Sequence, residues 1–285
     1  MVDVVNLIKD LRNKTGAGFL DCKKALLENN NNLDEAIEFL RKKGLAKASK
    51  KTSREANEGA VGIYSDENLI VIIKVNSETD FAAKSDTFLN FLDELGEFVL
   101  NYNNADISKE DFLNLSYKQA TISDFFKSMI AKIGENLILN DLIIIKNNQD
   151  YSSYYIHNSY RKNIGKIISL IKYQTNNNDD EVKLLSKNLC MHIAAMKPES
   201  IDIGDLDKTI VEKEKNIQKE LIISSGKPSN IVEKILDGKM KKFFSEVTLL
   251  NQAFILDPDK SINEVIKKYI EKNEYKITSF KIITL

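Results

Sequence analysis

A short polar stretch after an apolar run carries the residue types best suited to contact another molecule. Residues 69–75 are almost all β-branched or aliphatic, which predicts a buried strand. Residues 76–80 are rich in types that favour turns and helix caps. Phe81 follows, and its ring is either folded back onto its own domain, as most aromatic side chains are, or held out to meet a partner.

The groups that most often perform covalent chemistry give little sign of an active site. Cys22 and Cys190 are far apart in sequence, so neither a disulfide framework nor a thiolate metal site is expected. His192 lies in an apolar helical segment and is interpreted as a hydrogen-bonded core histidine. Cys190 falls on nearly the opposite face of that helix, which argues against a Cys/His dyad. Because the sequence also lacks a phosphate-binding glycine loop, a metal-ligand cluster and a nucleophile motif, we expect no enzymatic activity, no metal site and no cofactor.

The composition is that of an ordinary globular protein. A chain of 285 residues has room for two or three domains, and 42% hydrophobic with 29% charged residues is typical of a packed fold. The net charge of −1 argues against a globally basic nucleic-acid binder. No apolar run approaches the roughly 20 residues that span a bilayer, and the N-terminus does not resemble a signal or transit peptide. We therefore expect a cytoplasmic protein without membrane or direct nucleotide binding.

The elements that precede the polar stretch form a small helical domain and a linker. Residues 1–45 are expected to be three short helices, broken by residues 15–18 and 29–32 and ended by Gly44. Residues 46–56 are basic and are interpreted as a solvated linker. An RNA-binding strip is the alternative, but no aromatic residues are interleaved for base stacking.

The remaining chain is expected to form an α+β core of two similar halves that a helical arm interrupts. The first half is 57–146, with strands at 60–64, 69–76 and 137–145 and helices at 86–102 and 122–133. The second half is 147–204 and 244–285, with strands at 151–157, 164–173, 254–256 and 275–285, a helix near 182–196 and another opened by a capping box at 261–264.

The arm, residues 205–243, reads as a helical hairpin that turns at residues 225–228. Ile210, Ile217 and Leu221 keep spacings of seven and four, which predicts that they form its apolar seam with residues of the return helix. Charged residues dominate the other faces. The tip could pair with another chain, so self-association into a homodimer is one expectation for the arm.

The polar stretch at residues 76–81 closely resembles the signature of the elongation factor Ts family, the guanine nucleotide exchange factors of the ribosomal GTPase elongation factor Tu. Further family motifs occur in the expected order at residues 11–12, 15–18, 21–26, 132–136, 191–195, 197–198 and 238–243. Several independent motifs in order are far more specific than one, and together they cover essentially the whole chain.

The resemblance implies both a fold and a contact surface. It implies a ubiquitin-associated-like three-helix domain, a bipartite α+β core and a protruding coiled coil. Thr79, Asp80, Phe81 and Ala82 correspond to a loop that intrudes beside the nucleotide site of the GTPase, with the aromatic ring wedged between helices. The other implied contacts with the GTPase are Arg12, Phe19, Leu20, Lys23, His157, Ile255 and Leu256.

Several of these residues also have a purely structural interpretation. Arg12 and Lys23 would ordinarily be solvated helix residues, and we expect one of Phe19 and Leu20 to close the three-helix core. For His157, only the resemblance suggests a role, because its side-chain chemistry by itself indicates none.

Three features depart from the family pattern. Ala82 stands where Val is frequent, and Asn158 and Ser159 stand where glycines are common, which puts the placement of His157 in question. Some members also carry a C-terminal helical module after the last strand, and this sequence stops at Leu285.

The leading hypothesis is that the protein binds GDP-bound elongation factor Tu, displaces Mg²⁺ and promotes GDP release during translation elongation. The alternative is an adaptor that binds partners through the three-helix module and the helical arm without accelerating exchange.

Overall fold

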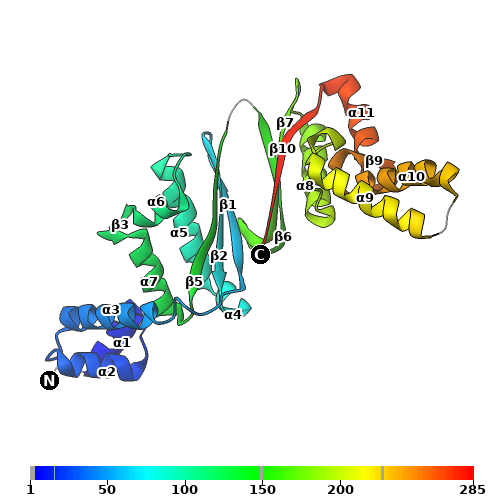
Figure 1. Cartoon of the computed structure of the whole chain (residues 1–285). Coiled ribbons are helices and arrows are strands. Elements are labelled where there is room, and N and C mark those ends of the chain that lie inside the picture. The colour runs from blue at the N-terminus through cyan, green and yellow to red at the C-terminus, as the bar shows by residue number, and fades with distance from the viewer. Residues whose placement is uncertain (1–3, 16, 148–149, 226–227) are drawn as a thin grey trace. The chain divides into compact units, whose positions relative to one another are not determined.

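The structure, a computed structural model, describes residues 4–15, 17–147, 150–225 and 228–285. It combines helices and strands in two compact units and is an α+β protein, as the sequence predicts (Figure 1). The first unit holds the chain as far as Lys146 together with residues 158–166 and 285, and the second holds residues 147–157 and 167–284. Two residues of the predicted arm turn, 226 and 227, and Gly16 of the predicted N-terminal break lie outside the described residues.

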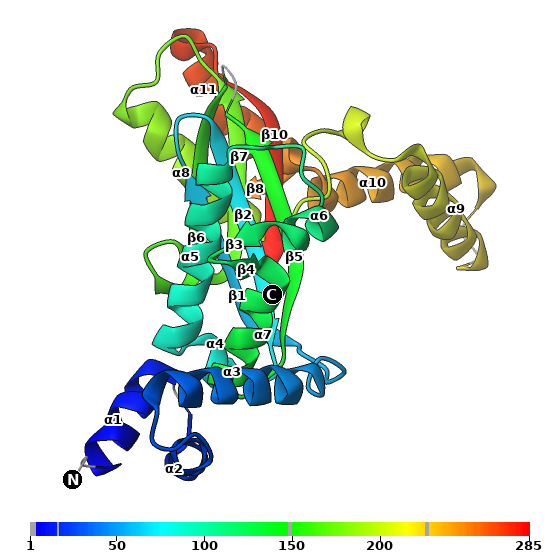
Figure 2. The same ribbon diagram turned by 90° about the vertical axis from the view of Figure 1, so that its left-hand side faces the viewer.

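Three helices begin the first unit: α1 (Val4–Thr15), α2 (Phe19–Glu28) and α3 (Leu33–Ser49) (Figure 2). Asn32 caps α3, because its Oδ1 accepts hydrogen bonds from the amides of Asp34 and Glu35 at 3.1 and 3.3 Å. The helices pack around a small apolar cluster made of Ile8, Leu11, Cys22, Ala25, Leu26, Ala36 and Leu40. The predicted helices in this part of the chain are therefore present.

The prediction that Gly44 ends the third helix is wrong, because α3 continues to Ser49. The extension is held by packing, since Ala48 is fully buried in the main core of the first unit. Gly44 lies against a neighbouring helix, where a Cβ would be only 3.1 Å from the Cβ of Ala131. The first part of the expected linker is thus a helix docked on the core.

Three antiparallel strands form the sheet of the first unit in the order β1 (Glu58–Ser65), β2 (Leu69–Ser77) and β5 (Leu137–Lys146). All but one residue of β2 are buried, as the apolar run predicts. The helices α5 (Asp86–Tyr102) and α7 (Ile122–Ile133) share one core with the sheet and have the predicted bounds. Smaller elements that sequence periodicity did not reveal are α6 (Lys109–Asn114), β3 (Ser116–Tyr117) and β4 (Ala120–Thr121).

The second unit contains a hairpin of β6 (Tyr151–Arg161) and β7 (Ile164–Gln174), whose last and first residues respectively belong to the first unit. The last strand, β10 (Lys276–Thr284), pairs antiparallel with β7. The other elements of its body are α8 (Asp180–Met196), η1 (Ile203–Asp205), η2 (Leu249–Asn251), β8 (Ala253–Phe254), β9 (Asp257–Ser261) and α11 (Ile262–Asn273). The predicted capping box opens α11, because Ser261 and Glu264 exchange side-chain to amide hydrogen bonds.

The predicted strand at residues 254–256 is wrong in part. The strand β8 stops at Phe254, which pairs with Asp257 across a tight turn that contains Ile255 and Leu256. The amide of Ile255 donates to the imidazole Nδ1 of His192 at 3.3 Å instead of joining a strand ladder. A buried side chain therefore decided the turn, and no local sequence signal announces that contact.

The arm consists of α9 (Lys208–Ser224) and α10 (Ser229–Val247), which lie side by side in Figures 1 and 2. The predicted seam on α9 is wrong, because Ile210, Ile217 and Leu221 are exposed. The seam uses Val211 and Ile222 instead, each one position further along, where a step of about 100° turns the side chain toward α10. Self-association through the arm stays a prediction. Within the described ranges, no helix is both long enough and apolar enough to cross a bilayer.

Gly96 offers a test of how tightly the first unit is packed. A Cβ at Gly96 would lie 2.2 Å from Cδ2 of Tyr64, a buried ring whose hydroxyl donates to Asp93 at 3.1 Å. We expect Gly96→Ala to cost roughly 1–3 kcal/mol by overpacking, which outweighs the gain of about 1 kcal/mol in helix propensity. Gly238→Ala in α10 is the matched control, because a Cβ there meets no atom within 4 Å. Urea unfolding followed by circular dichroism should show a lower midpoint for Gly96→Ala and a slightly higher one for Gly238→Ala; equal midpoints would refute the packing argument.

Candidate functional site

The candidate site is built on the one-turn helix α4 (Asp80–Ala83), which directly follows β2. Thr79 is its N-cap, with Oγ1 accepting the amide hydrogen of Ala82 at 3.3 Å. Ser77 is buried at the end of β2 and donates to the carbonyl of Thr79 at 2.9 Å. Ser85 donates to the carbonyl of Ala82 at 2.8 Å and then caps α5. The polar residues of the signature therefore fold the chain into a short helix between two rigid elements.

The ring of Phe81 is held out from the protein. It is 83% exposed, whereas Ala82 is 7% exposed and Ala83 is fully buried. Successive side chains on a helix diverge by about 100°, so burying the two alanines turns the preceding residue outward. A large apolar ring is thus exposed at a fixed place, one of the two alternatives that the sequence left open. Ala82, by contrast, has little side-chain surface left for a partner.

Two carboxylates fasten the start of α4 to the segment that follows α7. Glu135 accepts from the amide of Thr79 at 2.9 Å and from its hydroxyl at 2.7 Å. In return, Glu78 accepts from the amide of Asn136 at 2.6 Å. Hydrogen bonds to charged groups are each worth about 1.5–3 kcal/mol, more than a neutral pair. The two segments, 56 to 58 positions apart in the chain, therefore hold each other through a reciprocal carboxylate clamp.

A second set of contacts supports the clamp from behind. Asn136 is buried and donates from its side chain to the carbonyl of Arg54 at 2.7 Å, while the guanidinium of Arg54 pairs with Glu78 at 3.4 Å. Gly134 ends α7 with φ of +89°, a left-handed conformation that favours glycine, and Lys51 donates to its carbonyl. The motif at residues 132–136 was recognised from the sequence, but its role in the clamp was not.

Asp80 does not carry a free charge beside the ring. Its carboxylate accepts from the ammonium of Lys84 one turn later at 2.7 Å, and this hydrogen bond lowers the pKa of Asp80. Lys84 also lies 5.9 Å above the ring of Tyr160. A partner would therefore meet an ion pair next to Phe81.

The four residues of α1 and α2 for which the resemblance implies contacts with a partner are all exposed. Arg12 and Lys23 are exposed, and so are Phe19 and Leu20, the latter by 79%. The expectation that Phe19 or Leu20 closes the three-helix core is wrong. Cys22, Ala25 and Leu26 fill that core, and Leu20 and Lys23 fall on the other side of α2.

The resemblance implies three contact residues in the second unit, of which one lies on β6 and two lie on the turn between β8 and β9. His157 is exposed on β6, with Nδ1 3.4 Å from the hydroxyl of Tyr155. Asn158, which follows it, has φ of +50°. Asn tolerates this left-handed conformation better than most residues, so it is a workable substitute for the glycine common there in the family. Leu256 is 54% exposed at the tip of the β8–β9 turn.

His192 fixes the β8–β9 turn from within the core. It is fully buried, and its Nε2 lies 2.9 Å from Oε1 of Gln252 while its Nδ1 accepts the amide hydrogen of Ile255. This arrangement requires the proton on Nε2. Gln252 donates in turn to the carbonyl of Glu246 at 2.7 Å. The prediction of a hydrogen-bonded core histidine is confirmed, and the structure adds that it positions the turn that carries Leu256.

The titratable groups of the described part of the chain bear on two further kinds of site, a metal site and a nucleophile. There, no group of three or more His, Cys, Asp or Glu side chains could hold a metal ion. Cys190 is buried, which raises the pKa of its thiol to about 12, and its Sγ contacts the carbonyl of Ser153 at 3.1 Å. Such a thiol is a poor nucleophile.

Comparisons with known proteins agree with the sequence motifs. A family model described as elongation factor TS matches residues 78–285. Proteins named elongation factor Ts are similar over most of the chain: that of Rickettsia prowazekii (strain Madrid E) is 40% identical over 278 residues, covering 96% of this chain and 89% of its own. The protein of Ehrlichia ruminantium (strain Gardel) is 39% identical, covering 94% and 93%, and that of Sinorhizobium fredii (strain NBRC 101917 / NGR234) is 39% identical, covering 92% and 85%.

Removal of the Glu135 half of the clamp should loosen the start of α4 without unfolding the protein. Glu135→Ala deletes both acceptors of Thr79, so we expect amide hydrogen exchange at Thr79 to accelerate on the order of tenfold or more. Glu110→Ala is the matched control, because Glu110 is an exposed glutamate on α6. Exchange measured by NMR or mass spectrometry should change near residue 79 only in the first variant. Unchanged protection of Thr79 would show that the clamp does not hold α4.

The buried imidazole should make stability depend on pH. Burial lowers the pKa of His192 in the folded chain, so the unfolded chain binds a proton more readily. Stability from this group is therefore complete above about pH 6.5 and is lost as the pH falls from that value toward the lower folded pKa. Urea midpoints measured between pH 7.5 and 5.5 should fall with acidification, and His192→Gln should flatten the slope. His157→Gln, the exposed control, should retain it.

Proposed function

This chain belongs to the elongation factor Ts family, and on that premise we propose that it is a guanine nucleotide exchange factor for elongation factor Tu. It binds the GDP-bound GTPase, weakens the hold on Mg²⁺ and promotes release of GDP during translation elongation. The observation that carries the proposal is the exposed ring of Phe81 on a short helix whose start is fastened by the carboxylate clamp. An exposed aromatic on a rigid support is suited to enter an apolar cleft of another protein.

The mechanism follows from how a GTPase holds its nucleotide. Mg²⁺ bridges the phosphate oxygens, and backbone amides cradle the phosphates. Mg²⁺ needs near-ideal octahedral geometry, so a small displacement of the segments that position it weakens binding. In the proposal, Phe81 enters between helices of the GTPase and displaces these segments. The exchange factor forms and breaks no covalent bond, so it is not an enzyme.

The rigid support is what lets the wedge act on the partner. If α4 could retreat, insertion of the ring would move the exchange factor and leave the GTPase undisturbed. The clamp, the Thr79 cap and the burial of Ala82 and Ala83 oppose that retreat. The Asp80–Lys84 pair lies beside the ring, and either group can exchange its partner for a polar group of the GTPase.

The other contact residues supply affinity and orientation in this proposal. Arg12, Phe19, Leu20 and Lys23 offer two cations and two exposed apolar side chains from α1 and α2. His157, Ile255 and Leu256 contribute from the second unit. Coupling between factor and nucleotide is reciprocal: a factor that weakens nucleotide binding is itself bound less tightly once fresh nucleotide enters, which releases it.

Truncation of the wedge provides the direct test. Phe81→Ala should slow release of labelled GDP from elongation factor Tu by about one to three powers of ten, because an aromatic anchor is worth roughly 2–4 kcal/mol. Phe81 makes few contacts within its own chain, so the fold should be unchanged by circular dichroism. Tyr102→Ala, which removes another exposed aromatic side chain, should release GDP at the normal rate.

The same assay separates the adaptor alternative. An adaptor would bind elongation factor Tu in a pull-down or by calorimetry yet leave the rate of GDP release unchanged. If the unaltered protein binds without acceleration, the exchange function fails. If it accelerates release and Phe81→Ala does so equally well, the wedge fails while exchange stands.

A further inference from the structure

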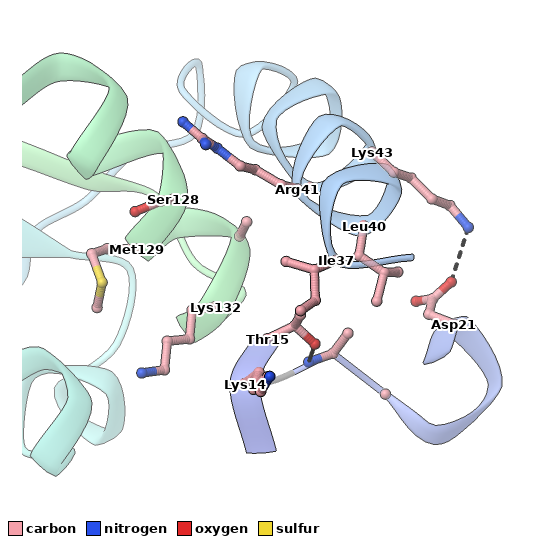
Figure 3. A pocket seen from close by; sticks show the side chains of 14 residues that line it. Lys14, Thr15, Asp21, Ile37, Leu40, Arg41, Lys43, Ser128, Met129 and Lys132 are labelled. Atoms are coloured by element: carbon pink, nitrogen blue, oxygen red, sulfur yellow. Dashed lines mark hydrogen bonds and ion pairs between the residues drawn. The ribbon is translucent and has the colours of Figure 1, made fainter. Parts of the chain in front are cut away.

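A cavity of about 410 Å³ in the first unit lies outside the candidate site (Figure 3). Residues at the end of α1 and around the start of α2, from Lys14 and Thr15 to Ala17, Gly18 and Asp21, form one wall. The stretch from Ile37 to Gly44 of α3 forms the second, and Ser128 to Lys132 of α7 form the third. Its volume falls within the roughly 300–1,000 Å³ typical of small-molecule sites. The cavity therefore has the size to hold an organic molecule.

Small residues at two places create the cavity. Where α3 and α7 touch, Gly44 faces Ala131, so the helix backbones approach closely and the space opens beside that contact. On the opposite wall, Ala17 and Gly18 bring almost no side-chain volume, and a Cβ at Gly18 would meet no atom within 4 Å. The backbone at Gly18 has φ of −64°, which any residue can adopt. The backbone therefore does not require glycine at position 18, and the space exists because the residue there has no side chain.

The charge around the cavity is strongly positive in a chain whose net charge is −1. Lys43 is paired with Asp21, the acidic residue of the lining, at 3.0 Å. Lys14, Arg41 and Lys132 also line the cavity, and none of them has an ion-pair partner among the described residues. Because the cations of the lining outnumber its one acidic residue, they favour the approach of an anion.

The floor of the cavity is apolar. Ile37 and Leu40 lie side by side on α3, whereas Met129, which lines the cavity from α7, points to the other side of that helix (Figure 3). Thr15 and Ser128 are satisfied locally, since their hydroxyls donate to the carbonyls of Leu11 and Phe125 at 2.6 and 2.7 Å. The polar interactions still available at the rim are therefore mainly those of the cations.

We propose that this cavity binds a small organic anion with an apolar body. The body packs on Ile37 and Leu40, and the anionic group, a carboxylate, sulfonate or phosphate, is attracted by the cations at the rim, Lys14, Arg41 and Lys132. An apolar pocket with a small number of polar or charged groups around it is the usual form of a small-molecule site. The site requires neither exchange activity nor the GTPase.

The test uses the full-length protein and the fluorescent probe 8-anilinonaphthalene-1-sulfonate, an aromatic body with one sulfonate. Titration should show saturable binding of one probe per chain. Arg41→Glu with Lys132→Glu should weaken binding about tenfold or more, because charge-assisted contacts are lost. Gly18→Leu should abolish binding by filling the space. N-phenyl-1-naphthylamine, the uncharged analogue, should be indifferent to the charge reversal.

Lys213→Glu with Lys215→Glu is the matched control, since it changes the net charge equally using exposed lysines of the arm. Circular dichroism and thermal melts should show that every variant is folded. Binding that is weakened equally by the control pair reflects net charge alone and overturns the proposal. Binding that survives Gly18→Leu, or an absence of saturable binding to the folded protein, overturns it as well.

Discussion

The reciprocal pairing of Glu78 with Asn136 and of Glu135 with Thr79 is the constraint on which the candidate site depends. It joins the end of β2, a strand in which all but one residue are buried, to the C-terminal end of α7, and so holds the start of α4 in place. An exposed aromatic ring gains nothing from its own fold, and it would collapse onto the surface if its backbone were free to move. The clamp keeps the exposed ring of Phe81 at a fixed place on the surface.

Small residues at helix contacts are a second feature on which the first unit depends. Gly96 lets α5 lie against Tyr64, and Gly44 lets α3 lie against Ala131, so that a helix of the N-terminal domain becomes part of the main core. Close approach at these points fixes the helices where α4 and the cationic cavity are formed. Interiors are packed like crystals, so a single methyl group at such a contact is felt by its neighbours.

Much of the fold could be predicted because local patterns and tertiary packing agree. The bounds of α5 and α7 follow from apolar side chains at helical spacing, and β2 from an apolar run of strand length. Predictions failed where a distant contact overrode the local signal. Gly44 reads as a helix end but docks on α7, and Ile255 reads as strand but bonds to His192. On α9, the residues that pack against α10 lie one position after the predicted ones.

The sequence by itself determined the family, the α+β class and the identity of the signature residues, because these are carried by residue types in order along the chain. It could not decide whether the ring of Phe81 is buried, because folded-back and projecting rings have the same local sequence. Tertiary structure decided that question by burying Ala82 and Ala83 and by bringing Glu135 to Thr79 across 56 residues. Burial and long-range hydrogen bonds are properties of the folded chain, so no local pattern can contain them.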